Sequence, residues 1–173
     1  EILIGNESKI KQYIFRELAS SSVPRLHEFD ARHLSNFIYA FGLVEEVVLV
    51  EDGSTYFDML AEEILRYDNL DEFLPQHLSN ILWAYANVKV SNSQLFKKVG
   101  DHIVTMNNLD EFWPQALSNT LWAYATLDEQ HTKLFEKVGD HIVRLDNLND
   151  FWPQALKDLV WACATTGESH SQL

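Results

Sequence analysis

Two Asp-His pairs, each made of consecutive residues, are the part of this 173-residue sequence that could do chemistry. Asp101-His102 and Asp140-His141 each follow a glycine, and a histidine beside a carboxylate can serve acid–base catalysis or bind a metal. The two histidines are 39 residues apart, however, and helices that stack lie about 8–10 Å from each other, too far for the rings to share one ion. We therefore interpret both pairs as solvated or hydrogen-bonded structural residues.

No other pattern in the sequence carries catalytic chemistry. It contains no Gly-rich phosphate loop, no nucleophile elbow and no cluster of metal ligands. A single cysteine, Cys163, excludes an internal disulfide and a Cys-based zinc site. The sequence thus predicts a protein that is not an enzyme, uses no cofactor or metal and takes no small-molecule substrate.

The histidines recur because the sequence itself repeats with a period of 39 residues. Segments 71–109 and 110–148 are identical at 24 of 39 positions, and an older copy lies upstream with five extra residues in the connection 44–54. Neither end carries a polar capping unit, so we expect a piece of a longer array. The predicted units are a half repeat at 1–27, repeats at 28–70, 71–109 and 110–148, a half repeat at 149–166 and a short tail at 167–173.

Each unit contains two patterns of apolar residues spaced three and four apart, which is typical of amphipathic helices. In the third repeat, Pro114 suits the first helical position, and Phe112 with Leu117 has the spacing of a hydrophobic staple. Because one helix pair cannot bury both of its faces, the sequence predicts an all-α solenoid of stacked two-helix units. The expected helices span about 8–20, 31–42, 54–66, 75–87, 92–105, 114–126, 130–144 and 153–165.

Aromatic residues recur at the same period. Trp83, Trp122 and Trp161 lie within apolar stripes, where an aromatic side chain is more often part of the core than a stacking platform for bases. Trp113 and Trp152 precede their helices and need not be buried, so they are candidates for stacking or for anchoring a partner. Cys163 replaces Tyr85 and Tyr124 of the earlier units and is expected to be a buried small hydrophobe.

Polar residues also recur along the first helix of each unit. The Ser-Asn pairs that end at Asn80 and Asn119 follow Gln76 and Gln115 by one turn. They form either a polar ladder facing a ligand or a structural ladder that bonds the neighbouring backbone. The complete set of candidate binding residues is Gln76, Asn80, Asn87, Trp113, Gln115, Asn119, Thr126, Trp152, Gln154 and Thr165.

The composition excludes some classes of partner. The formal net charge is −13, which speaks against a surface that attracts nucleic acid or anionic membrane everywhere. The basic residues of the second helices could serve phosphates only if that side is the inner one: Lys97, Lys98, Lys133, Lys137 and Arg144. No apolar run approaches the roughly 20 residues needed to span a bilayer, so we expect a soluble intracellular protein without membrane insertion.

The motif Pro-Gln-x-Leu-x-x-x-Leu-Trp-Ala, at 75–84 and again at 114–123, resembles the octotricopeptide repeat and related helical repeats upstream of RAP domains. The resemblance runs from Phe29 to Thr165. It implies a stack of α-hairpins that binds single-stranded organelle RNA along its concave face, with about one nucleotide for each unit. It also implies a chloroplast or mitochondrial location and a role in RNA stability, splicing or translation.

A second hypothesis from a different class stays open. Between Glu45 and Glu72 there are ten acidic residues and one basic residue, Arg66. This surface and the near-identity of the central units suit a protein-interaction scaffold within a larger complex. Trp113 and Trp152 would then anchor a basic protein partner.

Overall fold

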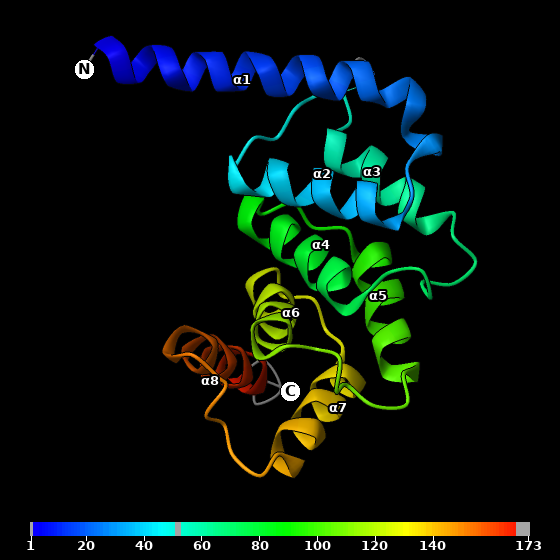
Figure 1. Cartoon of the computed structure of the whole chain (residues 1–173), viewed down its shortest axis with the longest axis vertical. Helices are drawn as coiled ribbons and strands as arrows, with labels where there is room; N and C mark the ends of the chain where they lie inside the picture. Colours follow the sequence, from blue (N-terminus) through cyan, green and yellow to red (C-terminus); the bar gives the residue numbers. More distant parts are fainter. Residues whose placement is uncertain (1, 51–52, 169–173) are drawn as a thin grey trace.

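The chain forms an α-solenoid in which each even-numbered helix from α2 to α8 packs against the next even-numbered helix (Figure 1). The computed structural model describes residues 2–50 and 53–168. Helices α2, α4, α6 and α8 lie side by side and form the first row, whereas α3, α5 and α7 form a second row beside it. The helices are α1 (Ile2–Ser22), η1 (Val23–Glu28), α2 (Ala31–Leu43), α3 (Tyr56–Leu65), α4 (Pro75–Val88), α5 (Ser93–Thr105), α6 (Pro114–Thr126), α7 (Thr132–Arg144) and α8 (Pro153–Glu168).

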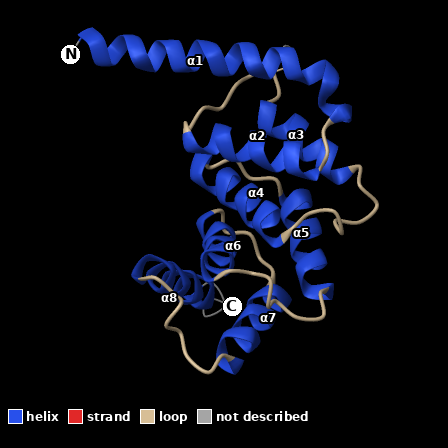
Figure 2. Ribbon diagram, in the orientation of Figure 1, coloured by secondary structure: helices blue, strands red, loops and turns tan. Residues whose placement is uncertain are grey.

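The prediction of an all-α solenoid is confirmed, and the bounds of α2 through α7 agree with the expected ones to within two residues. The 3₁₀ helix η1 was not expected, and α1 is longer at both ends than its predicted span. Figure 2 shows helices joined by loops throughout. In the long connection before α3, Leu49 and Thr55 form one isolated antiparallel bridge.

The start of each first-row helix follows the predicted chemistry. Pro114 is the first residue of α6, where its missing N–H costs nothing. Phe112, two positions earlier, is buried against the core together with Leu117, as a hydrophobic staple requires. The turn before it is closed by Asn108, whose side-chain oxygen accepts a 3.0 Å hydrogen bond from the backbone N–H of Asp110. Asn69 and Asn147 repeat this bond 39 residues away on either side.

Small residues allow the first-row helices to pack closely. A Cβ atom on Gly42 of α2 would lie 2.6 Å from the Cβ atom of Ala84 in α4, so only glycine fits this contact. The middle of α4 is buried on two sides, by α2 and by α6, and its Ser79 and Ala84 are fully buried. The first row therefore forms a continuous core.

Tyrosine side chains connect the two rows. The hydroxyl of Tyr85 donates a 2.5 Å hydrogen bond to the carbonyl oxygen of Phe57, and Tyr124 makes the same bond to Phe96 at 2.6 Å. Burial raises the pKa of both hydroxyls, which therefore stay protonated as donors. At the corresponding place in α8 the prediction was wrong: Cys163 is exposed, because no further helix of the described chain packs beyond α8 to cover it.

Candidate nucleic-acid interface

One stripe of each first-row helix is exposed or half-buried, apart from Asp158 of α8, which is 8% exposed. In α4 it consists of Gln76, Asn80, Trp83 and Asn87, whose spacings of four, three and four residues place them on one side of the helix. The residues between them are buried against α2 and α6, except His77, which is half-buried. We call the four aligned stripes the amide–aromatic face. Its members are Arg32, Asn36, Tyr39 and Leu43 on α2, Gln76, Asn80, Trp83 and Asn87 on α4, Gln115, Asn119, Trp122 and Thr126 on α6, and Gln154, Asp158, Trp161 and Thr165 on α8.

The amides of this face pair within each helix. Gln76 donates from Nε2 to Oδ1 of Asn80 at 2.7 Å, and Gln115 does the same to Asn119 at 3.2 Å. In α8 the acceptor is the carboxylate of Asp158, 2.8 Å from Gln154 Nε2. These bonds hold the side chains in line along the helix surface. The predicted structural ladder, in which each asparagine bonds the neighbouring backbone, does not form at Asn80 or Asn119.

That structural role belongs instead to other residues. Ser35 donates to the carbonyl oxygen of His77 at 3.4 Å, and Asn87 donates to that of Gly42 at 3.1 Å. Thr165 donates to the carbonyl oxygen of Trp161 within its own helix. The Thr126 hydroxyl is buried and has no hydrogen-bond partner among the described residues. Of the three candidate positions at the helix ends, Asn87 is thus engaged in holding α4 on α2.

The aromatic residues of the face are partly buried. Trp83 and Trp122 pack one side against the core and keep an edge at the surface, whereas Trp161 is 43% exposed. The rings of Tyr39 and Trp83 lie 5.3 Å apart between centroids, across the contact of α2 with α4. The expectation that the tryptophans belong to the core therefore holds in part for the two central ones and fails at the end of the row.

The two central helices of this face carry no charged side chain. Helices α4 and α6 contain no Asp, Glu, Lys or Arg. The face carries Arg32 at one end and Asp158 at the other, the latter paired with Lys157 at 2.9 Å. Two lysines of the second row donate hydrogen bonds to backbone carbonyl oxygens of the preceding unit. Lys98 donates to the carbonyl oxygens of Leu65 and Tyr67, and Lys137 repeats this at Val104 and Met106.

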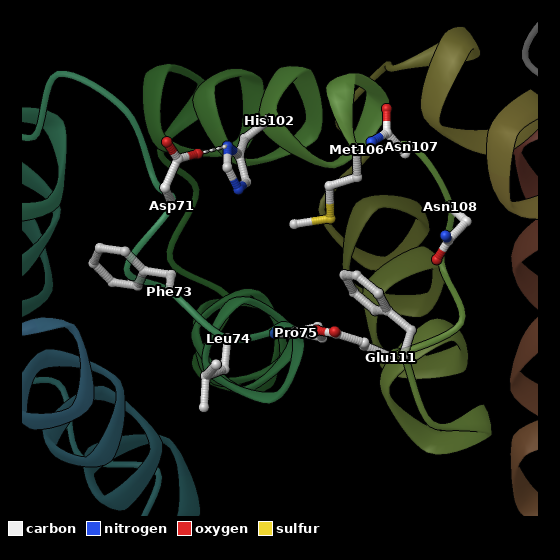
Figure 3. A pocket seen from close by; sticks show the side chains of 10 residues that line it. Asp71, Phe73, Leu74, Pro75, His102, Met106, Asn107, Asn108 and Glu111 are labelled. Atoms are coloured by element: carbon white, nitrogen blue, oxygen red, sulfur yellow. Dashed lines mark ion pairs between the residues drawn. The ribbon is translucent and has the colours of Figure 1, made fainter.

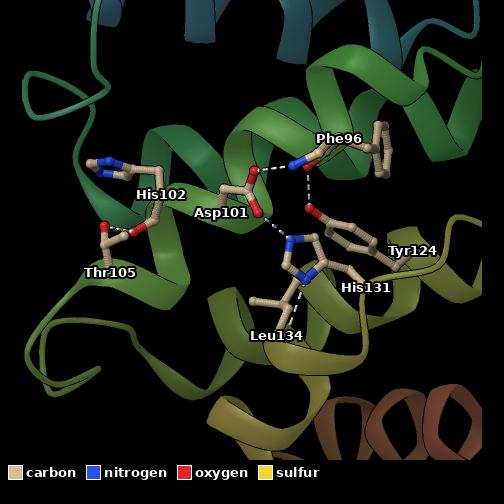
Figure 4. Close-up of polar contacts among 8 residues, drawn as sticks. Phe96, Asp101, His102, Thr105, Tyr124, His131 and Leu134 are labelled. Atoms are coloured by element: carbon tan, nitrogen blue, oxygen red, sulfur yellow. Dashed lines mark hydrogen bonds and ion pairs between the residues drawn. The ribbon is translucent and has the colours of Figure 1, made fainter.

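The Asp-His pairs do not form pairs in space (Figure 4). Asp101 binds Lys97 and the Nε2 atom of His131, at 3.2 Å, and these contacts lower the pKa of its carboxyl. His102 instead faces Asp71, 3.9 Å away, and His141 faces Asp110 at the same distance. The structural interpretation of both pairs is supported by these contacts.

No metal centre arises from these residues. Within residues 2–50 and 53–168, no group of three or more His, Cys, Asp or Glu side chains could hold a metal ion. The sequence did not identify His131 as a residue that contacts Asp101. The available signal was that His131 is equivalent to Asn92, 39 residues earlier. Both are N-cap residues, with Asn92 accepting from Leu95 N–H and His131 from Leu134 N–H.

Two hollows lie at the edge where the first-row helices begin. One, of about 310 Å³, is lined by residues that include Asp71, Leu74, His102 and Glu111 (Figure 3). A second, of about 290 Å³, shares Leu74 and Glu111 and reaches Trp113. The candidate residues Trp113 and Trp152 belong to this edge and not to the amide–aromatic face, and they are 74% and 76% exposed. The sequence-predicted residues thus fall on two surfaces, which meet at Gln76, a further residue that lines the second hollow.

No helix in the described part of the chain is both long and apolar enough to cross a membrane.

Comparison with known proteins gives the family. No curated protein matches the sequence. A family model does match, over residues 9–171, and it describes the RNA-editing substrate-binding complex 6 protein, RESC6. The chain therefore belongs to the RESC6 family of RNA-editing substrate-binding complex proteins.

Proposed function

We propose that this protein is a non-enzymatic binding module of a mitochondrial RNA-editing complex and that its amide–aromatic face contacts single-stranded RNA. The family name supports RNA processing within a larger assembly, with both RNA and proteins as partners. The observation that carries the proposal is the absence of carboxylates from α4 and α6, together with the aligned amides and indole rings on them. The narrower assignment to octotricopeptide repeats stays a prediction.

The side chains of this face suit bases better than phosphates. Carboxamide groups donate to and accept from the polar edges of bases, and an indole ring stacks on any base for about 1–3 kcal/mol. Gln76, Asn80 and Trp83 are the same residue types as Gln115, Asn119 and Trp122. Two adjacent units with identical contact residues would prefer the same base or tolerate several. We therefore expect binding with little sequence preference across the central units.

The charges of the face determine how its affinity for RNA depends on salt concentration. Arg32 and Lys157 are the cations on or beside it among the described residues, and Lys157 is already paired with Asp158. The logarithm of affinity for a single strand falls with the logarithm of salt at about −0.7 for each phosphate neutralised. One or two such contacts give a slope between about −0.7 and −1.4, which is shallow for an RNA-binding protein.

Binding of an unstructured RNA of mixed sequence to the whole chain tests the proposal. Replacing Gln76, Gln115 and Gln154 with alanine should weaken binding by at least about tenfold, since each exposed amide contributes about 0.5–1.5 kcal/mol. The matched control replaces three exposed glutamines elsewhere, Gln12, Gln94 and Gln130, and should bind as the parent does. Absence of binding at about 50 mM salt, or equal loss in both variants, would reject the proposal.

A further inference from the structure

A row of exposed apolar side chains marks a second surface. Leu74, Trp113 and Trp152 each immediately precede the proline that begins a first-row helix, and they are 58%, 74% and 76% exposed. Exposed indole rings at repeated positions are unusual in a protein that has a core to bury them in. We call these three residues, together with Glu72, Glu111 and Asp150, the tryptophan edge.

Hydrogen bonds fix the backbone at these positions. The phenylalanine before each one is buried, and the carbonyl oxygen of Trp113 accepts hydrogen bonds from Ala116 N–H at 2.8 Å and Leu117 N–H at 3.1 Å. The carbonyl oxygen of Trp152 accepts one from Leu156 N–H at 3.1 Å. Because the backbone is already ordered, a partner that packs on these rings restricts only their side-chain torsions, which suits interface anchors.

The charge at this edge defines the partner. Glu72, Glu111 and Asp150 lie two residues before the three anchors and are exposed. None of the three forms an ion pair within residues 2–50 and 53–168. The segments 71–76, 110–115 and 149–154 contain no lysine or arginine. RNA phosphates are repelled from such a surface, whereas Arg and Lys side chains gain both ion pairing and a cation–π contact with tryptophan.

The spacing of the edge defines the conformation of the partner. Neighbouring first-row helices are in contact, and the axes of packed helices lie about 8–10 Å apart, which sets the scale of the spacing between anchors. A polyproline II segment advances about 3.1 Å per residue and returns to the same side every third residue, which gives about 9.3 Å. Between two of the anchors lies the hollow of about 290 Å³ lined by Leu74, Glu111 and Trp113, which is large enough for a long side chain.

We infer that the tryptophan edge docks an extended, basic protein segment that places Arg or Lys at every third residue. Its cationic side chains lie over Trp113 and Trp152 and beside Glu111 and Asp150. This surface meets the amide–aromatic face at Gln76, which also lines the hollow. The two surfaces share no other named residue, so the protein can hold a protein partner and RNA at the same time. The inference does not depend on RNA binding.

Labelled peptides of one composition and two arrangements test the inference on the whole chain. In the first peptide arginine alternates with two small or proline residues, and in the second the same arginines are clustered at one end. We expect the spaced peptide to bind at least about fivefold more tightly by fluorescence anisotropy. Equal binding of both peptides would mean unspecific attraction to an acidic protein and would overturn the inference.

Variants then locate the site. The double variant Trp113→Ala with Trp152→Ala should weaken the spaced peptide by about tenfold, and Glu111→Gln with Asp150→Asn should weaken it and flatten its salt dependence. The matched control is Val143→Ala with Asp146→Asn, which changes exposed residues of the second row and the turn after it. Because all of these side chains are exposed, the variants should keep the circular dichroism and melting temperature of the parent.

The two proposals fail separately. A variant with Gln115→Ala and Gln154→Ala, which leaves Gln76 in the hollow unchanged, should weaken RNA binding and keep the peptide, and the double tryptophan variant should do the reverse. Unchanged peptide binding by the double tryptophan variant would overturn the inference about the edge. Displacement of the peptide by single-stranded RNA would also overturn it, because the edge would then be a nucleic-acid site.

Discussion

Gly100 of α5 lies directly beneath the imidazole ring of His131, the N-cap residue of α7. A Cβ atom at Gly100 would approach Cδ2 of His131 to 2.4 Å and the hydroxyl oxygen of Tyr124 to 2.6 Å. The ring bridges two second-row helices, because its Nδ1 atom accepts from Leu134 N–H at 3.3 Å and its Nε2 atom lies 3.2 Å from Asp101. The glycine is therefore a condition for the contact between neighbouring repeats.

The pair Gly100 and Gly139 gives the sharpest test of this contact. Gly100→Ala should lower the free energy of unfolding by about 1–3 kcal/mol, since the new methyl group overlaps the ring and the hydroxyl. Gly139→Ala places a methyl group with no atom within 4 Å and should raise stability by about 0.5–1 kcal/mol through helix propensity. Urea unfolding of both variants measures the difference. Equal effects of the two substitutions would show that packing on His131 is not the reason for the glycine.

The unpartnered hydroxyl of Thr126 predicts a stabilising substitution. In the preceding repeat Asn87 bridges to the carbonyl oxygen of Gly42, and threonine is too short to make the equivalent bond. Thr126→Asn should therefore raise the free energy of unfolding by about 0.5–1.5 kcal/mol. Thr165→Asn, at the exposed equivalent in α8, should change it by less than about 0.5 kcal/mol. A loss of stability in Thr126→Asn would mean that α4 and α6 leave no room for the longer side chain.

Two half-buried histidines should make the fold less stable in mild acid. Burial lowers the pKa of both His77 and His102 below the ordinary value near 6.5. The unfolded chain therefore takes up protons at a higher pH than the folded protein does. Stability from these groups is complete above the unfolded pKa and is lost as the pH falls through about 6.5 toward the lower folded values.

Chemical unfolding between about pH 7.5 and pH 5.5 checks this expectation. His102→Gln should show a smaller fall in unfolding free energy over that range than the parent protein shows. The exposed His27→Gln variant should fall as steeply as the parent. The paired carboxyl of Asp101, whose pKa is lowered by Lys97, loses its contribution only at a much lower pH, near the ordinary carboxyl range. A parallel decline in all three proteins would contradict the role of His102.

Much of the fold follows from local signals that every repeat carries. Pro114 at the first helical turn, Asn108 in the preceding turn and the three- and four-residue apolar spacing all point to the same helix bounds, and the structure has them. What local signals could not give is the environment at the end of the row. Cys163 and Trp161 occupy core positions in the sequence pattern, yet they are exposed because burial of α8 depends on a neighbour and not on its own residues.

The candidate site was predictable as residue types but not as surfaces. Gln76 and Asn80 recur in the sequence, and their spacing of four residues already allowed the hydrogen bond that the structure shows. The 39-residue spacing does not separate Trp113 from Trp122, but the place of Trp113 before Pro114 does. The structure agrees, because Trp113 is exposed and Trp122 packs against the core.

The most direct test of the account is photochemical crosslinking of the whole chain to a single-stranded RNA that carries 4-thiouridine, followed by peptide mass spectrometry. The account predicts adducts within segments 76–87, 115–126 and 154–165, which carry the amide–aromatic face, and none at Trp113 or Trp152. Adducts concentrated on Lys133 and Arg144 of the second row, or on the tryptophan edge, would contradict it.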